Sequence, residues 1–291
     1  MKLAAFQFQT QRYVGLVSKD LQTVTPFLLS EEQASRGALT VIEMLAEGKA
    51  LPAQGAPMAI QDVCLLAPIP HPRRNIFCVG KNYLDHVKEI KDSKLGEAQG
   101  SMANLAKAPV IFSKVPESVI GTGASIDSHS GVSQEVDYEA ELAIVIAKKG
   151  KGIKKEDALQ YVWGYTIVND VSARDLQAKH VQFHVGKSLD TFCPMGPWLV
   201  SADELDASSA SIKCWVNGEL RQSGSTEQMI FDIPTIIENL SAGMTIYPGD
   251  VIATGTPSGV GMGMKPPQFL KKGDTVKIEI AGIGTLENPV I

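Results

Sequence analysis

The chain has 291 residues, of which 44% are hydrophobic and 20% are charged, and this composition excludes an intrinsically disordered protein. Its net charge of −5, with lysines and arginines scattered along the sequence, argues against nucleic acid as a partner. No apolar run reaches the roughly 18 residues of a membrane span, and the first residues lack the apolar stretch of a signal peptide. The four cysteines form no CxxC pair, so the sequence predicts reduced thiols in a cytoplasmic protein without a membrane partner.

The first part of the chain, residues 1–69, opens with two strand-like pieces. A helical pattern follows at 31–47, with Ser30 as its candidate N-cap. The segment 68–75 (PIPHPRRN) then carries three prolines, which continue neither a helix nor a sheet, so it is typical of a linker. We therefore expect a small N-terminal α/β domain, followed by a second domain at 70–291.

The second domain is predicted to be strand-rich α+β with a closed or rolled sheet. Its short apolar runs, separated by glycines, predict strands at 75–80, 108–114, 136–146, 165–170, 197–200, 211–218, 250–255 and 274–280. Helices are expected only at 82–90, 155–162, 172–181 and 232–241. The polar and weakly patterned segment 91–107 is typical of a mobile functional loop.

The strand 136–146 (VDYEAELAIVI) carries carboxylates on one face, because alternation places Asp137, Glu139 and Glu141 on the same side. This face could simply be solvated. However, acidic residues are poor strand formers, and the following apolar residues indicate a strand that enters the core. Burying like charges without partners costs several kcal/mol each, and a divalent cation removes this cost. Oxygen ligands alone favour Mg²⁺ or Mn²⁺.

A third oxygen ligand is predicted at Asp170, where the apolar strand 165–170 ends. A helix should follow, with Ser172 as N-cap and Asp175 three residues later in a capping-box spacing. The alternative role of Asp170 is to cap this helix itself, but Ser172 already fills that position.

The same helix places Arg174 and Gln177 three residues apart on one face, which suits an anionic carboxylate of a substrate. An ordinary surface pair is the alternative. Lys187 precedes a turn fixed by proline and glycine, and Thr256 lies in a glycine-rich turn that follows a strand and can present a hydroxyl to an anion.

A candidate general base lies in the segment 78–90 (CVGKNYLDHVKEI). His86 and Glu89 are three residues apart on one helical face, and a carboxylate beside a histidine fixes its tautomer. Such pairs also occur by chance on exposed helices, so this stretch alone leaves both interpretations open.

Five ordered blocks together resemble the fumarylacetoacetate hydrolase family over roughly residues 70–291: CVGKNYLDHVKE, VDYEAELAIVI, GYTIVNDVSARDLQ, GKSLDTFCPMGPW and ATGTPSGVGMGMKPP. The resemblance implies a mixed β-roll catalytic domain. It also implies Mg²⁺ or Mn²⁺ bound by Glu139, Glu141 and Asp170. By the same resemblance, the catalytic residues are His86, Glu89 and Lys187, and the substrate-binding residues are Arg174, Gln177 and Thr256. Larger eukaryotic members of the family use a fourth carboxylate ligand upstream of the histidine. The segment before His86 has no equivalent of it, which fits the smaller bacterial members with three ligands.

The function that this resemblance implies is metal-dependent cleavage of a C–C bond in a small anionic 2-oxo or 2,4-dioxo acid. An acylpyruvate such as fumarylpyruvate would be hydrolysed, or oxaloacetate decarboxylated, in each case through an enolate of pyruvate that the metal stabilises. Isomerisation or decarboxylation of hydroxymuconate-type diacids is an alternative, and a non-catalytic metal-stabilised binding protein is another. The family also suggests a homodimer.

Overall fold

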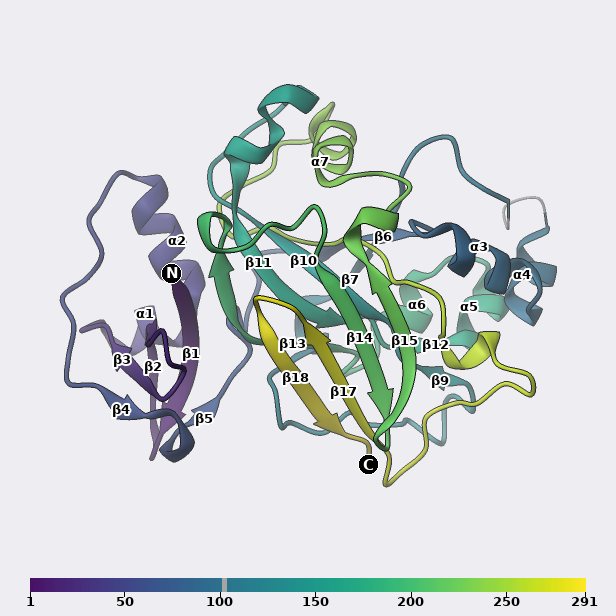
Figure 1. Cartoon of the computed structure of the whole chain (residues 1–291), viewed down its shortest axis with the longest axis horizontal. Helices are drawn as coiled ribbons and strands as arrows, with labels where there is room; N and C mark the ends of the chain where they lie inside the picture. The colour runs from purple at the N-terminus through teal and green to yellow at the C-terminus, as the bar shows by residue number, and fades with distance from the viewer. Residues whose placement is uncertain (101–103) are drawn as a thin grey trace.

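The computed structural model describes residues 1–100 and 104–291, and it is a strand-rich α+β structure, as predicted (Figure 1). Within this described part, 12 strands form the main sheet. Its central path runs in the order β4 (Met58–Ala59), β3 (Thr23–Pro26), β2 (Gln11–Val17), β1 (Lys2–Phe8), β13 (Cys193–Ser201), β11 (Val162–Asn169), β10 (Ala140–Ile146), β16 (Val251–Ala253), β6 (Ile76–Gly80) and β7 (Val110–Lys114). Two short strands lie off this path, β5 (Cys64–Leu65) beside β1 and β8 (Val119–Ile120) beside β13.

A second sheet packs against β10 and β11 of the main sheet. It is antiparallel and runs in the order β15 (Glu219–Ser225), β14 (Ser211–Val216), β17 (Thr275–Ile280) and β18 (Gly284–Pro289). Buried and less buried residues alternate along β14 and β17, so one face of each strand enters the core. That face meets β10 and β11, in which every residue is buried. The strand 136–146 therefore does run into the interior, as its apolar end predicts.

The predicted helix 31–47 is divided by Gly37 into α1 (Glu31–Ser35) and α2 (Ala38–Ala46). Gly37 has a positive φ of 62°, and a Cβ at this position would lie 2.4 Å from the carbonyl oxygen of Pro68. Only glycine fits such a close approach in the left-handed region. The predicted N-cap is confirmed, since Ser30 and Gln33 form a reciprocal capping box.

The linker segment is fixed to the second part of the chain. Arg74 donates to Asp250 and, at 3.0 Å, to the carbonyl oxygen of Thr245, and its guanidinium lies over the ring of Phe77. In addition, β1 pairs antiparallel with β13, so the N-terminal strands extend the main sheet. The boundary between domains at residues 69 and 70 stays a prediction.

A group of helices gathers at one end of the molecule, opposite the N-terminal strands (Figure 1). They are α3 (Leu84–Lys91), α4 (Lys94–Gln99), α5 (Arg174–His180) and α6 (His184–Lys187). The helix α7 (Ile233–Ser241) confirms the prediction at 232–241 and begins at Asp232, which accepts from the amide of Thr235. The segment predicted as a helix at 155–162 is instead a 3₁₀ helix, η4 (Lys155–Tyr161).

Part of the predicted loop 91–107 is helical, because α4 lies within it. Ser93 caps this helix by accepting from the amide of Gly96, and Leu95 is buried against Val260 and Met262. A side-chain cap and one buried apolar residue thus support α4. Residues 101–103, which include Met102 of the predicted loop, lie outside the described residues.

The predicted capping box at the start of α5 is wrong. Ser172 belongs to β12 (Ser172–Ala173), which pairs with β9 (Val136–Asp137), and its hydroxyl donates to the carbonyl oxygen of Asp170. Asp175 instead accepts from Ser133. The chain at this point forms a short ladder, and this tertiary pairing overrides the local capping pattern.

All four cysteines are free, as predicted, although Cys64 is exposed rather than part of the core. Over the ranges 1–100 and 104–291, no helix has the length and apolar character needed to cross a membrane.

Candidate functional site

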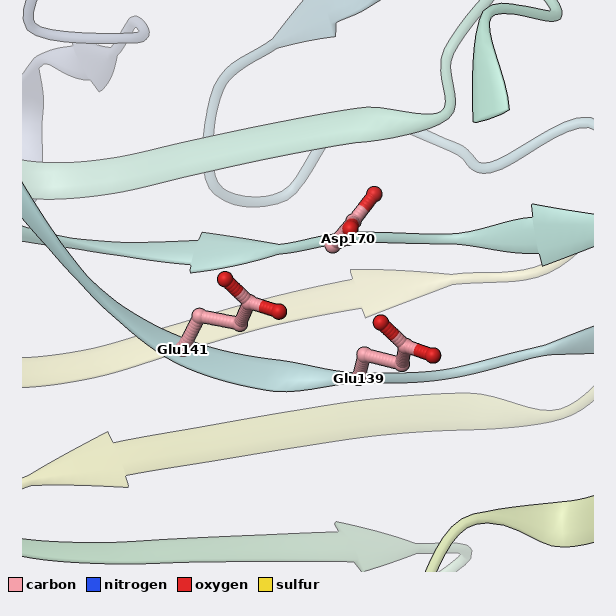
Figure 2. A group of neighbouring side chains, drawn as sticks. All are labelled: Glu139, Glu141 and Asp170. Atoms are coloured by element: carbon pink, nitrogen blue, oxygen red, sulfur yellow. The ribbon is translucent and has the colours of Figure 1, made fainter. Parts of the chain in front are cut away.

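Three carboxylates converge where β10 and β11 pair. In this register Glu141 of β10 lies opposite Val168, Glu139 comes just before β10, and Asp170 comes just after β11. Figure 2 shows Glu139 and Glu141 projecting from one stretch of chain, with Asp170 on the neighbouring one. One oxygen of each carboxylate lies within 4.8 Å of the others, and all three side chains are buried. The structure therefore brings together the predicted ligand set.

The residues present in this carboxylate cluster fit a divalent cation. Three carboxylate oxygens are the donor set that hard cations such as Mg²⁺ and Mn²⁺ prefer. Burial, together with the nearby Asp170 and Glu139, raises the pKa of Glu141 well above its usual range. A bound dication would therefore favour the ionised form of Glu141.

Two cationic side chains already contact the cluster. The Nζ of Lys187 lies 2.7 Å from Glu139 Oε2 and 2.7 Å from Asp170 Oδ2, and Arg174 Nη1 lies 2.7 Å from Glu139 Oε1. Burial alone would raise the pKa of Glu139, but Lys187, Arg174 and His86 outweigh burial and hold that pKa well below its usual range. Glu139 thus stays ionised more readily than Glu141.

A third cation, Lys114 at the end of β7, was not predicted from the sequence. Its side chain is 0% exposed, and its Nζ lies 2.7 Å from Asp170 Oδ1 and 3.0 Å from the carbonyl oxygen of Val171. Since Lys187 holds Oδ2, both oxygens of Asp170 contact an ammonium group. A lysine at the end of an apolar strand was the only sequence signal for this contact.

The predicted dyad is assembled beside the cluster. His86 Nδ1 lies 3.2 Å from Glu89 Oε2, while Glu89 Oε1 accepts from the amide of Gly259 at 2.7 Å. The other ring nitrogen, His86 Nε2, lies 4.0 Å from Glu139 Oε1. With Glu89 on Nδ1, we assign the proton to Nδ1, which leaves Nε2 as the basic atom that faces the cluster.

Arg174 and Gln177 form a buried pair, so the surface-pair alternative is wrong. Arg174 is 3% exposed, and its Nη1 donates to Gln177 Oε1 at 3.1 Å. Within the described part of the chain, Arg174 Nη2 is buried without a hydrogen-bond partner. An unsatisfied guanidinium N–H at this position suits an anionic oxygen of a ligand.

Thr256 lines a small cavity beside the carboxylate cluster, but its hydroxyl already forms hydrogen bonds within the protein. Its Oγ1 donates to the carbonyl oxygen of Ala140 at 2.9 Å and accepts from Gln222 Nε2 at 2.7 Å. These contacts tie the glycine-rich turn to β10. A direct contact between Thr256 and a substrate stays a prediction.

Asp137 does not join Glu139 and Glu141, contrary to the expectation from alternation. The strand is interrupted at residues 138–139, since β9 ends at Asp137 and β10 begins at Ala140. The Asp137 carboxylate points to other groups, including Arg174 Nε at 2.9 Å and the amide of Gly261 at 2.7 Å. The break between β9 and β10 thus separates Asp137 from Glu139 and Glu141.

The space at the site is divided between two cavities. A cavity of about 20 Å³ lies among the cluster, His86 and Lys187, next to the rings of Phe112 and Phe183. A larger pocket of about 470 Å³ lies between α3–α4 and residues 262–269. Arg174 lines both, and Glu89 lines the larger pocket. The central cavity holds about one water molecule, so a substrate fits there only if some of the side chains that line it move.

We expect the amides of α4 to exchange rapidly in the free protein and at least tenfold more slowly with oxalate and Mg²⁺ bound. A helix of six residues is marginal by itself, and Leu95 is the main residue that anchors it. A ligand in the adjacent pocket would add contacts. Hydrogen exchange with and without oxalate plus Mg²⁺ measures this, with the amides of α7 as the reference. If the amides of α4 are equally protected from exchange in both states, α4 is a rigid side of the pocket that does not respond to the ligand.

The chain is similar to known proteins over most or all of its length. A family model described as the C-terminal region of fumarylacetoacetate (FAA) hydrolase matches residues 75–291. The oxaloacetate tautomerase YisK of Bacillus subtilis is 46% identical over 312 residues, which cover 100% of both chains.

Two solved structures are also similar over 100% of this chain and 99% of their own. A fumarylacetoacetate hydrolase from psychrophilic Exiguobacterium antarcticum has a TM-score of 0.83 at 42% identity. A 5-carboxymethyl-2-hydroxymuconate delta-isomerase from Mycobacterium smegmatis has a TM-score of 0.78 at 35% identity. With its strand-rich α+β fold, its buried carboxylate cluster and these similarities, the chain belongs to the fumarylacetoacetate hydrolase family.

Proposed function

We propose that this protein is a divalent-cation-dependent enzyme that interconverts the keto and enol forms of a small 2-oxo diacid, with oxaloacetate as its substrate. The observation that carries the proposal is the position of His86, which faces the carboxylate cluster with Nε2 4.0 Å from Glu139. Similarity over the full length to an oxaloacetate tautomerase supports the choice of substrate.

Keto–enol interconversion needs a proton carrier and a site that stabilises an enolate. His86 Nε2 accepts a proton from C3 of the keto form, and the same proton is then delivered to the C2 oxygen to give the enol. Glu89 stabilises the imidazolium that forms in between, because it contacts Nδ1 at 3.2 Å. A divalent cation held by Glu139, Glu141 and Asp170 would act as a Lewis acid and stabilise the negative charge that develops on the substrate.

The remaining cationic groups bind and orient the substrate. Arg174 offers its buried Nη2 to a carboxylate of the diacid. Lys187 adds a buried ammonium group at the edge of the cluster, where it favours negative charge on the substrate. Mg²⁺ or Mn²⁺ is proposed from the oxygen-only donor set. A homodimer belongs to the proposal on the resemblance to the family alone, and a location in the cytoplasm belongs to it on the cysteine content of the sequence.

Cleavage of a C–C bond is the second candidate, because it proceeds through the same kind of enolate. Oxaloacetate would lose C4 as CO₂, or an acylpyruvate would be cleaved by water that His86 deprotonates. The similarity to a fumarylacetoacetate hydrolase favours this candidate, and the central cavity of about 20 Å³ has room for one water molecule.

Ultraviolet absorbance with a panel of 2-oxo and 2,4-dioxo acids tests both candidates. We expect the enol absorbance of oxaloacetate to relax faster with the protein and Mg²⁺ than with Mg²⁺ alone, and EDTA to remove this effect. Pyruvate and CO₂ should form more slowly than the absorbance relaxes. Release of pyruvate at the same rate as the absorbance change would favour cleavage instead. A shifted double bond in a muconate diacid would favour isomerisation, and ligand binding without turnover would favour a binding protein.

A further inference from the structure

We propose that Asp137 is a positioning residue that joins Arg174 and the His86–Glu89 dyad into one unit around the carboxylate cluster. Nothing in the reaction proposed above uses Asp137 directly. The kinetic part of this inference rests on the proposed function, while its structural part stands on contacts alone.

The Asp137 carboxylate is fully buried and accepts four hydrogen bonds. Oδ1 accepts from the amides of Tyr138 at 2.9 Å and Gly261 at 2.7 Å. Oδ2 accepts from Arg174 Nε at 2.9 Å and the amide of Met262 at 3.0 Å. Every donor is an N–H group, and the donors come from three separate parts of the chain. A carboxylate that is satisfied in this way holds its partners at fixed positions.

One arm of this arrangement leads to the dyad through the segment 259–263 (GVGMG). Asp137 holds the amides of Gly261 and Met262, and the hydroxyl of Tyr138 donates to the carbonyl oxygen of Gly259 at 3.0 Å. In turn, the amide of Gly259 donates to Glu89, which contacts His86. The position of Glu89 therefore depends on a segment that Asp137 holds in place.

The close packing of this segment supports the same conclusion. A Cβ on Gly261 would lie 2.0 Å from the carbonyl oxygen of Gln268 and 2.7 Å from Asp137 Oδ1. A Cβ on Gly263 would lie 2.8 Å from the carboxylate of Glu89. The segment thus fits between Asp137 and the dyad only with glycine at these two positions.

The other arm leads to the cluster and to the substrate pocket. Arg174 reaches Asp137 through Nε and Glu139 through Nη1 at 2.7 Å, while Nη2 is left for a ligand. Two anchored nitrogens fix the plane of the guanidinium group, and this sets the direction of the third. Asp137 therefore controls a substrate-binding group and a proton carrier at the same time.

Asparagine is the most informative substitution for Asp137, because it keeps the shape of the side chain and removes one acceptor. In Asp137→Asn one carboxylate oxygen becomes an NH₂ group, and either orientation places that NH₂ against two N–H donors. Asp250 offers a matched control, because this buried carboxylate also accepts from an arginine, Arg74, and from an amide, that of Tyr247. In Asp250→Asn the NH₂ group faces one N–H donor at the Oδ1 position or two at the Oδ2 position, so a buried carboxylate loses its arginine contact in a similar way but in a part of the core away from the cluster.

We expect Asp137→Asn to lower kcat at least tenfold and to raise KM several-fold, with kcat and KM of Asp250→Asn within twofold of the wild type. Both variants should lose thermal stability. Hydrogen exchange of the amides at 259–262 should accelerate at least tenfold in Asp137→Asn only. Exchange is measured without substrate, so it tests the link to the dyad segment even if the protein lacks the proposed activity.

Gly261→Ala provides a second route, since it displaces the same segment without altering a charged group. It should reproduce the loss in kcat, while Gly131→Ala, where a Cβ meets nothing within 4 Å, should not. The inference is overturned if Asp137→Asn and Asp250→Asn have equal kinetics and equal exchange at 259–262. It is also overturned if Gly261→Ala has wild-type kinetics.

Discussion

Glu141→Ala is expected to abolish activity and to remove the stabilisation of the protein by Mg²⁺. Glu141 is one of three carboxylates within 4.8 Å, so its loss leaves a cation two ligands. By mass action, a ligand at 100 times its Kd stabilises a protein by about 2.7 kcal/mol, which corresponds to a rise in Tm of about 5 °C. The wild type should show this rise in Mg²⁺ or Mn²⁺, and the variant should show little of it.

The variant should nevertheless fold without metal. The pKa of Glu141 is raised by burial and by its acidic neighbours, so its ionised form costs stability above its usual pKa, and the substitution removes that cost. Thermal melts with EDTA and with Mg²⁺ measure both effects. Glu47→Ala, at an exposed glutamate, is the control and should behave as the wild type. Equal stabilisation of Glu141→Ala and the wild type by Mg²⁺ would remove Glu141 from the ligand set.

His86→Ala is expected to slow the interconversion of oxaloacetate tautomers about 10²–10⁴-fold, which is the usual contribution of a positioned general base. Metal binding should persist, because His86 Nε2 lies 4.0 Å from Glu139 and is not among the carboxylate ligands. Added imidazole should restore part of the rate, since it can occupy the space that the side chain leaves.

Two comparisons separate proton transfer from packing. Glu89→Gln should cost less than His86→Ala, because it weakens the support of the ring without removing the base. His71→Ala, at an exposed residue of the linker, should leave the rate unchanged. If the rate of His86→Ala falls less than tenfold, or if imidazole does not restore it, His86 shapes the cavity and does not transfer the proton.

The parts of the site that follow short sequence spacings could be predicted. Residues three apart on a helix share a face, and this is why His86–Glu89 and Arg174–Gln177 are found in contact. Glu139 and Glu141 project toward one another as alternation predicts, although Glu139 lies just before β10. Asp170 is predicted as the third ligand from its place at the end of an apolar strand, and the resemblance to the family implies the same residue. No spacing rule relates residues on different strands, so the sequence alone does not give the distance between them.

The supporting residues could not be predicted, because their contacts span long distances in sequence. Lys114 meets Asp170 across 56 positions, and Gly261 meets Asp137 across 124. Local rules also failed where tertiary contacts compete with them. Ser172 is drawn into a strand pair rather than a cap, and Gly37 divides a continuous helical pattern because Pro68 approaches it closely. The hydrogen-bond networks of the core can therefore be identified only from the three-dimensional structure.

The pairing of β1 with β13 limits how the chain could be divided or recombined. Lys2 and Leu3 lie opposite Val200 and Leu199, and every residue of β13 is buried. A fragment that lacked the N-terminal strands would leave this apolar strand with an uncovered edge, which is a template for aggregation. Exchange of N-terminal segments between relatives would therefore succeed only where the incoming segment supplies a strand in the same register. The N-terminal strands thus protect an edge of the main sheet that would otherwise be exposed.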